Sequence, residues 1–125
     1  MLVVVTRLQA EGWQGLRGVA ALSGQVVEQL RTQPGFLGAR LLLDRHRAAW
    51  TMTGWSDRRS LEGFREAHAP MTARLSEVAT GSASTAWIAD TLPRWQEVAT
   101  RWPAVPPPVR GLRRTVTVGQ PVPAP

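Results

Sequence analysis

Few side chains in this sequence can do acid–base chemistry. The 125 residues include two histidines and neither cysteine nor tyrosine. An unperturbed imidazole has a pKa of about 6.5, so His68 could accept a proton near neutrality. His46 lies between Arg45 and Arg47 in a short polar segment and is expected to be exposed. His68 is therefore the one candidate base, although a histidine near a helix end, just before Pro70, also serves commonly as a cap or surface residue.

Neither a metal site nor an activated nucleophile is indicated. Two separated histidines and scattered acids do not meet the ligand count of a zinc or iron centre. The lack of cysteine excludes a disulfide framework and a thiolate ligand. Ser23 has no histidine partner and no nucleophile elbow motif. We expect Ser23 to be structural, as we do four helical carboxylates without a paired acid: Glu28, Glu62, Glu66 and Glu97.

Large aromatic residues are the candidate walls of a ligand site. The alternating segment 50–55 carries Trp50 and Trp55, and Phe64 follows on a predicted helix that reaches His68. Trp50 and Trp55 can stack on a planar ligand, or they can fill a core or an interface. Trp13 follows a glycine in a predicted loop over 11–15, where it would close a pocket mouth or contact a partner. The stretch 50–68 is thus both a candidate site and a candidate core.

The hydrophobic periodicity predicts alternating strands and helices. Strands are expected over 2–8, 36–43, 48–55 and 83–89. Helices are expected over about 16–31, from a cap at Ser56 or Asp57 to about 68, and over 71–78. A last helix, capped by Asp90 or Thr91, carries its apolar residues at spacings of three and four: Trp95, Val98 and Trp102. Residues 115–118 are a β-branched run that could add a strand to a sheet edge, in this chain or in a neighbour.

This order of elements predicts an α+β, ferredoxin-like βαββαβ fold with a four-stranded antiparallel sheet. The domain would span residues 1–102 and include the extra C-terminal helix, followed by a Pro/Arg-rich extended tail over 103–125. Two helices cover only one face of such a sheet, yet the strands over 2–8 and 48–55 carry apolar residues on both faces. We therefore expect a homodimer that forms through the uncovered sheet face.

The charge does not indicate a nucleic-acid partner. The net charge is +6 and the pI about 11.7, but all 15 basic residues are arginine. Half of that charge lies in the tail over 103–125, and the remaining arginines are scattered among acids, without the interleaving with aromatic residues that single-strand binders use. No apolar run approaches the roughly 20 residues of a membrane span. The sequence thus favours a cytoplasmic protein without a nucleic-acid or membrane partner.

Several segments resemble the antibiotic-biosynthesis-monooxygenase-like superfamily of dimeric α+β barrels. These are the turn over 34–38, the strand over 50–55 and the Trp55-Ser56 junction that leads to Leu61 and Phe64. Residues 92–95 are similar to an uncharacterised bacterial branch of that superfamily. The resemblance covers about residues 1–102. It implies the fold and a pocket between the sheet and the helices, whereas none of these motifs is a catalytic signature.

The same resemblance implies two kinds of chemistry. Some members oxidise polycyclic aromatic quinols without metal or flavin, using asparagine, tyrosine and arginine side chains; here Arg7, Arg40 or Arg65 would stabilise a phenolate. Heme-degrading members carry an iron-ligating histidine in a stretch similar to the segment around His68. The asparagine that those enzymes place on the first strand corresponds to Thr6, and the chain contains no asparagine.

Three functions therefore stay open from the sequence. The first is the cofactor-independent oxidation of a flat aromatic small molecule, with His68 and Arg7 as catalytic residues and with ligand contacts from Thr6, Trp13, Trp50, Trp55 and Phe64. The second is a non-catalytic small-ligand-binding or assembly protein of the same fold, which the lack of asparagine and tyrosine favours. The third is heme binding or degradation through His68.

Overall fold

The computed structural model describes residues 1–44, 46–102 and 113–117. The sheet contains five strands in the order β4-β1-β3-β2-β5, and all its pairings are antiparallel. The strands are β1 (Leu2–Gln9), β2 (Phe36–Leu43), β3 (Ala48–Trp55), β4 (Gly81–Ile88) and β5 (Arg113–Thr117). The helices are α1 (Gly12–Leu30), α2 (Arg58–Ala67), α3 (Ala69–Val78) and α4 (Trp95–Arg101). The predicted α+β, ferredoxin-like fold is confirmed.

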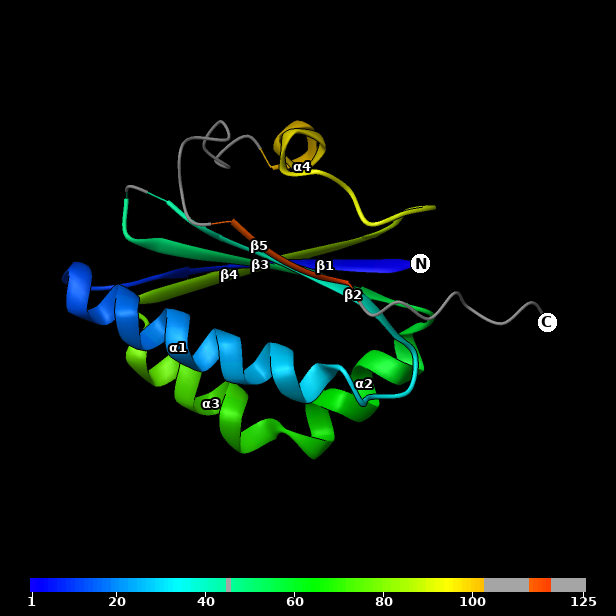
Figure 1. Cartoon of the computed structure of the whole chain (residues 1–125), viewed down its shortest axis with the longest axis horizontal. Coiled ribbons are helices and arrows are strands. Elements are labelled where there is room, and N and C mark those ends of the chain that lie inside the picture. Colours follow the sequence, from blue (N-terminus) through cyan, green and yellow to red (C-terminus); the bar gives the residue numbers. More distant parts are fainter. Residues whose placement is uncertain (45, 103–112, 118–125) are drawn as a thin grey trace.

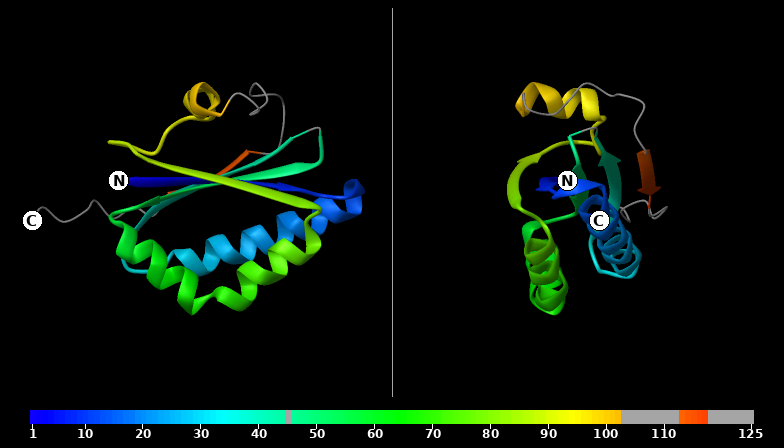
Figure 2. Two further views of the ribbon diagram at one scale, coloured as in Figure 1. Left: turned by 180° about the vertical axis from the view of Figure 1, so that it is seen from behind. Right: turned by 90° about the vertical axis from the view of Figure 1, so that its left-hand side faces the viewer.

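The molecule has three layers. Helices α1, α2 and α3 lie on one face of the sheet, and α4 lies on the other (Figures 1 and 2). We call these the helix-side face and the α4-side face. Strand residues alternate between them, because successive side chains of a strand point to opposite faces. On β1, Leu2 and Val4 pack in a cluster with α1 and α2, whereas Val3 and Val5 pack with α4.

The predicted strands over 36–43 and 48–55 have the observed bounds, and the hairpin between them is held by Asp44. Its Oδ1 accepts hydrogen bonds from the backbone N–H groups of His46 (2.8 Å) and Ala48 (3.0 Å). Its Oδ2 accepts one from Trp50 Nε1 at 2.7 Å. His46 is exposed, as predicted. The carboxylate thus fixes the turn and orients the Trp50 side chain of β3.

Asp57 is the N-cap of α2, as one of the two predicted caps. Its carboxylate accepts a hydrogen bond from the Ser60 backbone N–H at 2.7 Å. That bond stabilises the ionised form, so the pKa of Asp57 lies below its ordinary value. The cap explains why the chain turns from β3 into a helix at this point.

Two predicted helix starts are wrong. Helix α1 begins at Gly12, so the expected loop over 11–15 is its first turn; these residues bury little surface, and no apolar periodicity marked them as helical. Helix α4 begins at Trp95 with Arg94 as its N-cap and without a side-chain capping bond, so neither Asp90 nor Thr91 caps it. Short helix ends that are fixed by packing leave no capping signature in the sequence.

Strand β5 extends the sheet beyond the predicted four strands. It pairs with β2 of this chain, Ala39 being opposite Val116. The β-branched run predicted over 115–118 thus forms a strand that starts at Arg113, while residue 118 lies outside the described residues. The boundary between a domain over 1–102 and a tail over 103–125 stays a prediction. Residues 113–117 of the expected tail nevertheless join the sheet.

The α4-side face is covered within the chain. Trp95 and Val98 of α4 pack on Trp50 and Met52 of β3, and both β3 side chains are fully buried. Trp102 adds an edge contact to Trp50, with ring centroids 5.1 Å apart. The expectation of a homodimer assumed that this face was open, and α4 removes that reason. The assumption failed because only two helices were expected to cover the sheet, whereas α4 packs on its second face.

Candidate functional site

A row of hydroxyl groups crosses the helix-side face. Thr6 of β1 lies opposite Thr51 of β3 in one register and opposite Ser84 of β4 in the other, so the three side chains form one line across three strands. The Thr6 and Ser84 hydroxyl oxygens lie 3.1 Å apart, and Ser84 Oγ also donates to the Val5 carbonyl at 3.3 Å. We call Thr51, Thr6 and Ser84 the hydroxyl row.

Apolar clusters flank the hydroxyl row at both ends of the helix side. One cluster includes Val4, Trp55 and Phe64, together with Val27 of α1. A separate cluster contains Leu8, Ala49 and the α1 residues Leu16 and Val19. The row interrupts the apolar residues on the helix-side face of β1, where Leu2, Val4 and Leu8 are buried but Thr6 is only half-buried. The hydroxyl row therefore separates the two apolar clusters of the helix side.

Ser23 adds a fourth hydroxyl from the helix layer. It lies on the sheet-facing stripe of α1 between Val19 and Val27, which belong to the two separate clusters. Only 1% of Ser23 is exposed, and among the described residues its Oγ has no hydrogen-bond partner. An unpaired buried hydroxyl costs free energy unless something satisfies it. No sequence motif connected Ser23, Thr51 or Ser84 with a site. The one signal in the sequence was Thr6, a polar residue among the apolar residues on one face of β1.

The hydroxyl row can bind but has no titratable group. A serine or threonine hydroxyl both donates and accepts hydrogen bonds, so it suits phenol, ketone and amide groups of an uncharged ligand. Among the described residues, no group of three or more His, Asp or Glu side chains could hold a metal ion. The arrangement favours recognition of a neutral ligand with a polar edge and apolar faces.

Arg7 and Trp50 lie on the other face of the sheet. Arg7 alternates with Thr6 on β1, and its guanidinium lies 5.5 Å from the centre of the Trp50 ring. The same guanidinium donates a hydrogen bond to Gln9 Oε1. Trp50 is fully buried beneath α4. The proposed catalytic Arg7 and the proposed ligand contact Trp50 are thus not brought together with Thr6, Phe64 or His68.

Trp55, Phe64 and His68 form a stack that leads away from the hydroxyl row. The Trp55 and Phe64 ring centroids are 5.6 Å apart, and those of Phe64 and His68 are 4.7 Å apart. Trp55 and Phe64 are buried in the core, where Trp55 Nε1 donates to Thr53 Oγ1 at 3.0 Å. His68 Nε2 lies 3.1 Å from Gln33 Nε2, which joins the end of α2 to the segment after α1. Phe64 lies between His68 and Trp55 in this stack.

The His68 environment does not fit a heme ligand. An axial ligand needs a nitrogen lone pair that faces open space for the iron and the porphyrin. The face of the imidazole packs on Phe64, and its Nε2 contacts the Gln33 side chain. The imidazole is thus engaged by Phe64 on its face and by Gln33 at Nε2, and we assign no step to heme.

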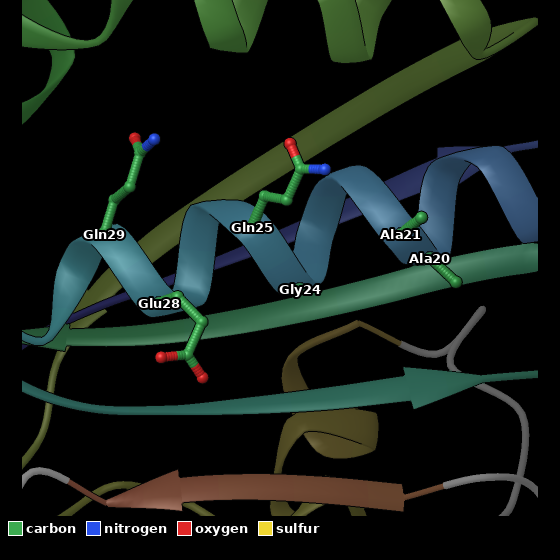
Figure 3. A pocket seen from close by; sticks show the side chains of 6 residues that line it. All are labelled: Ala20, Ala21, Gly24, Gln25, Glu28 and Gln29. Atoms are coloured by element: carbon green, nitrogen blue, oxygen red, sulfur yellow. The ribbon is translucent and has the colours of Figure 1, made fainter.

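Trp13 and a shallow pocket on α1 lie away from the hydroxyl row. Trp13 is 61% exposed in the first turn of α1. The described lining residues of the pocket all belong to α1: Ala20, Ala21, Gly24, Gln25, Glu28 and Gln29 (Figure 3). Figure 3 shows Glu28 pointing to the opposite side of the helix from Gln25 and Gln29. None of the pocket residues belongs to the buried stripe that carries Ser23.

Comparison with known proteins supports the fold assignment through structure alone. No family model and no curated protein matches the sequence. SnoaB from Streptomyces nogalater, a cofactor-independent oxygenase solved as a mutant form, superposes with a TM-score of 0.63 at 20% identity, over 74% of this chain and 97% of SnoaB. A putative antibiotic biosynthesis monooxygenase from Nitrosomonas europaea gives 0.63 at 11% identity, over 73% and 100%.

A third similar structure contains a ligand. The ActVA-Orf6 monooxygenase of Streptomyces coelicolor, solved in complex with nanaomycin D, superposes with a TM-score of 0.60 at 21% identity, over 74% of this chain and 92% of that protein. These matches span nearly the whole of each neighbour. The chain therefore has the fold of the antibiotic-biosynthesis-monooxygenase-like proteins, as the sequence resemblance predicted.

Proposed function

We propose that this chain binds a flat, hydroxylated aromatic small molecule against the hydroxyl row and oxidises it with molecular oxygen, without heme, metal or flavin. The observation that carries the proposal is the row itself, a line of hydroxyls between two apolar clusters on the helix-side face. The fold supports it, since one neighbour is a cofactor-independent oxygenase and another was solved with nanaomycin D.

The geometry suits a ligand with a polar edge. Thr51 would donate to a phenolic or quinone oxygen, whereas Thr6 Oγ1, whose proton serves Ser84, would accept from a phenol O–H. Each such hydrogen bond contributes about 1 kcal/mol net. The flanking clusters, with Val4 on one side and Leu8 on the other, would contact the apolar ring faces. A charged ligand would find no opposite charge in the row, so the proposed ligand is neutral in its resting form.

The oxidation would rely on the substrate's own electrons. In a phenol with an activated ring CH₂, the ring carbon loses two hydrogens and gains one oxygen atom as a carbonyl, while the second oxygen atom leaves as water. The hydroxyl row would stabilise the phenolate from which the first electron passes to oxygen. Since no described residue of the row titrates near neutrality, the rate should rise with pH along the ionisation of the substrate phenol.

An anthrone-type phenol in aerobic buffer tests this proposal. Calorimetry measures binding, and an oxygen electrode measures uptake with and without the protein and a chelator. One oxygen consumed per ketone formed, at a rate proportional to protein and insensitive to the chelator, is the expected result. If the protein neither binds this phenol nor accelerates its oxidation above the buffer rate, the proposal is wrong.

A second candidate is a non-catalytic carrier or assembly protein with the same ligand class. It is favoured by the lack of a titratable group in the hydroxyl row among the described residues. The same experiment separates the two functions, because a carrier would bind the phenol with measurable heat and leave its oxidation rate at the buffer value.

A further inference from the structure

Two arginines on the α4-side face stack on tryptophan rings. The Arg7 guanidinium of β1 lies 5.5 Å from the centre of the Trp50 ring. The Arg101 guanidinium, at the end of α4, lies 5.1 Å from the centre of the Trp87 ring of β4. A guanidinium that stacks on an indole is held in place, while the N–H groups at its edge can still donate hydrogen bonds. Both arginines are therefore oriented donors.

Arg101 is not neutralised by an acid. Glu97 lies one helical turn earlier on α4, at the spacing at which acidic and basic side chains pair on a helix. The Arg101 guanidinium stacks on Trp87 instead, and within the described part of the chain it forms no ion pair. Arg101 is exposed, so its positive charge faces the solvent.

Arg7 also keeps its charge without an acidic partner among the described residues. Its guanidinium donates a hydrogen bond to the side-chain oxygen of Gln9, which is uncharged. Asp44 contacts the other side of this group of residues, at Trp50 Nε1, but both of its carboxylate oxygens already accept hydrogen bonds. The α4-side face thus presents two positive charges, on a chain with a net charge of +6.

Strand β4 is uncovered between the two arginines. Ala83 lies opposite Arg7, and Trp87, beneath Arg101, lies four residues further along the strand. These two positions are about 13 Å apart in an extended strand. Thr85 lies between them on the same face. Ala83 is exposed and Thr85 half-buried, because the buried side chains of α4 pack on the neighbouring strands. This stretch can accommodate a flat molecule of two fused rings.

We propose that Arg7, Ala83, Thr85, Trp87 and Arg101, here called the arginine surface, bind an aromatic carboxylate. The Arg101 guanidinium would donate two parallel hydrogen bonds to the carboxylate, the geometry for which its planar shape is suited. The rings would lie along β4 over Thr85 and Ala83. Arg7 would contact the far end of the rings, since a guanidinium is attracted to an aromatic face.

The arginine surface and the hydroxyl row are separate sites for ligands of different charge. Thr6 and Arg7 are neighbours on β1, and they lie on opposite faces of the sheet. The hydroxyl row offers no charge to a carboxylate, whereas the arginine surface offers two positive charges. An aromatic carboxylate would therefore bind at the arginine surface without displacing a neutral phenol from the hydroxyl row.

Calorimetric titration of the full chain with 2-naphthoate at low ionic strength tests the proposal. Arg101→Gln removes the charge-assisted hydrogen bonds and should lower the affinity about tenfold. Arg7→Gln should lower it about threefold, as expected for a cation–π contact at an exposed site. Arg74→Gln is the matched control for Arg101→Gln, because Arg74 is exposed on α3, on the other side of the sheet, and the net charge changes equally.

Both exposed arginines can be replaced without disturbing the core, and circular dichroism establishes that each variant is folded. Wild type, Arg74→Gln and Thr6→Val should bind 2-naphthoate equally, and Arg101→Gln more weakly. A wild type that gives no binding heat at millimolar naphthoate overturns the proposal, as does an unchanged affinity in Arg101→Gln.

Two further results would contradict the arginine surface. An equal loss in Arg101→Gln and Arg74→Gln would mean that net charge alone attracts the anion. A loss in Thr6→Val would mean that naphthoate binds at the hydroxyl row. The expected result does not depend on whether the chain binds or oxidises a phenol.

Discussion

Thr6 Oγ1 and Ser84 Oγ lie 3.1 Å apart although the two residues are 78 positions apart in the chain. The contact exists because β1 pairs with β4 in a register that places these residues opposite each other. The same alternation points Arg7 to the α4-side face. Thr6 and Arg7, adjacent in sequence, thus lie on different faces of the sheet, Thr6 in the hydroxyl row and Arg7 on the α4-side face.

Packing of α4 should contribute strongly to stability. Trp95 is buried against the β3 cluster, so Trp95→Ala should leave a large cavity and cost about 3 to 5 kcal/mol, much of the stability of a small domain. Trp13→Ala is the matched control, because Trp13 is mostly exposed, and should change stability by less than about 0.5 kcal/mol. Urea unfolding measures both. Equal effects of the two substitutions would show that α4 does not cover the sheet as described.

Two glycines should respond to alanine with opposite signs. Gly35 has φ +79°, and a Cβ there would run into the side chains of Ser56 and Ser60. Gly63 lies in α2 with nothing within 4 Å of the position of a Cβ. We expect Gly35→Ala to lower the melting temperature and Gly63→Ala to raise it, the latter by up to about 1 kcal/mol in stability. A Gly35→Ala variant as stable as wild type would contradict the turn geometry.

Ser23→Ala distinguishes a structural serine from one that serves a ligand. Removing the unpaired buried hydroxyl should stabilise the unliganded protein by about 1 kcal/mol, since alanine also favours the helix. If the hydroxyl contacts the ligand, the same variant should bind it more weakly. Calorimetric affinity and urea unfolding give the two quantities. A destabilised variant would mean that Ser23 Oγ has a protein partner.

His68 should act through packing. His68→Ala removes its contacts with Phe64 and Gln33 and should cost about 1 kcal/mol of stability. Added hemin should give the same absorption spectrum with wild type, His68→Ala and the exposed-histidine control His46→Ala. A Soret shift that only His68→Ala abolishes would show that the imidazole turns away from Gln33 and binds iron.

The fold was largely predictable from local patterns. The strands over 36–43 and 48–55 were predicted with their observed bounds, because alternating apolar residues and a polar hairpin mark both ends. The Asp57 cap was visible because a carboxylate just before a helical period is a local signal. The first turn of α1 was missed because residues such as Trp13 bury little surface and carry no periodicity.

The candidate site was much less predictable. Thr6 was expected near a ligand, but its partners Thr51 and Ser84 depend on strand order and register, which no local pattern reveals. Trp50 and Trp55 alternate on one strand, so they could not share a pocket, and the covering of Trp50 depends on a helix more than 40 residues later in the chain. Long-range pairing decides these contacts, and a single sequence records it weakly.

Ligand affinity of Thr6→Val tests the central claim most directly. Valine keeps the shape of threonine but removes its hydroxyl, so the affinity for the anthrone-type phenol should fall about fivefold, the equivalent of about 1 kcal/mol. Thr85→Val is the control, because Thr85 is a strand neighbour of Ser84 that faces the α4 side. We predict a weaker dissociation constant for Thr6→Val and an unchanged one for Thr85→Val. Wild-type affinity in Thr6→Val, or an equal loss in both variants, would contradict binding at the hydroxyl row.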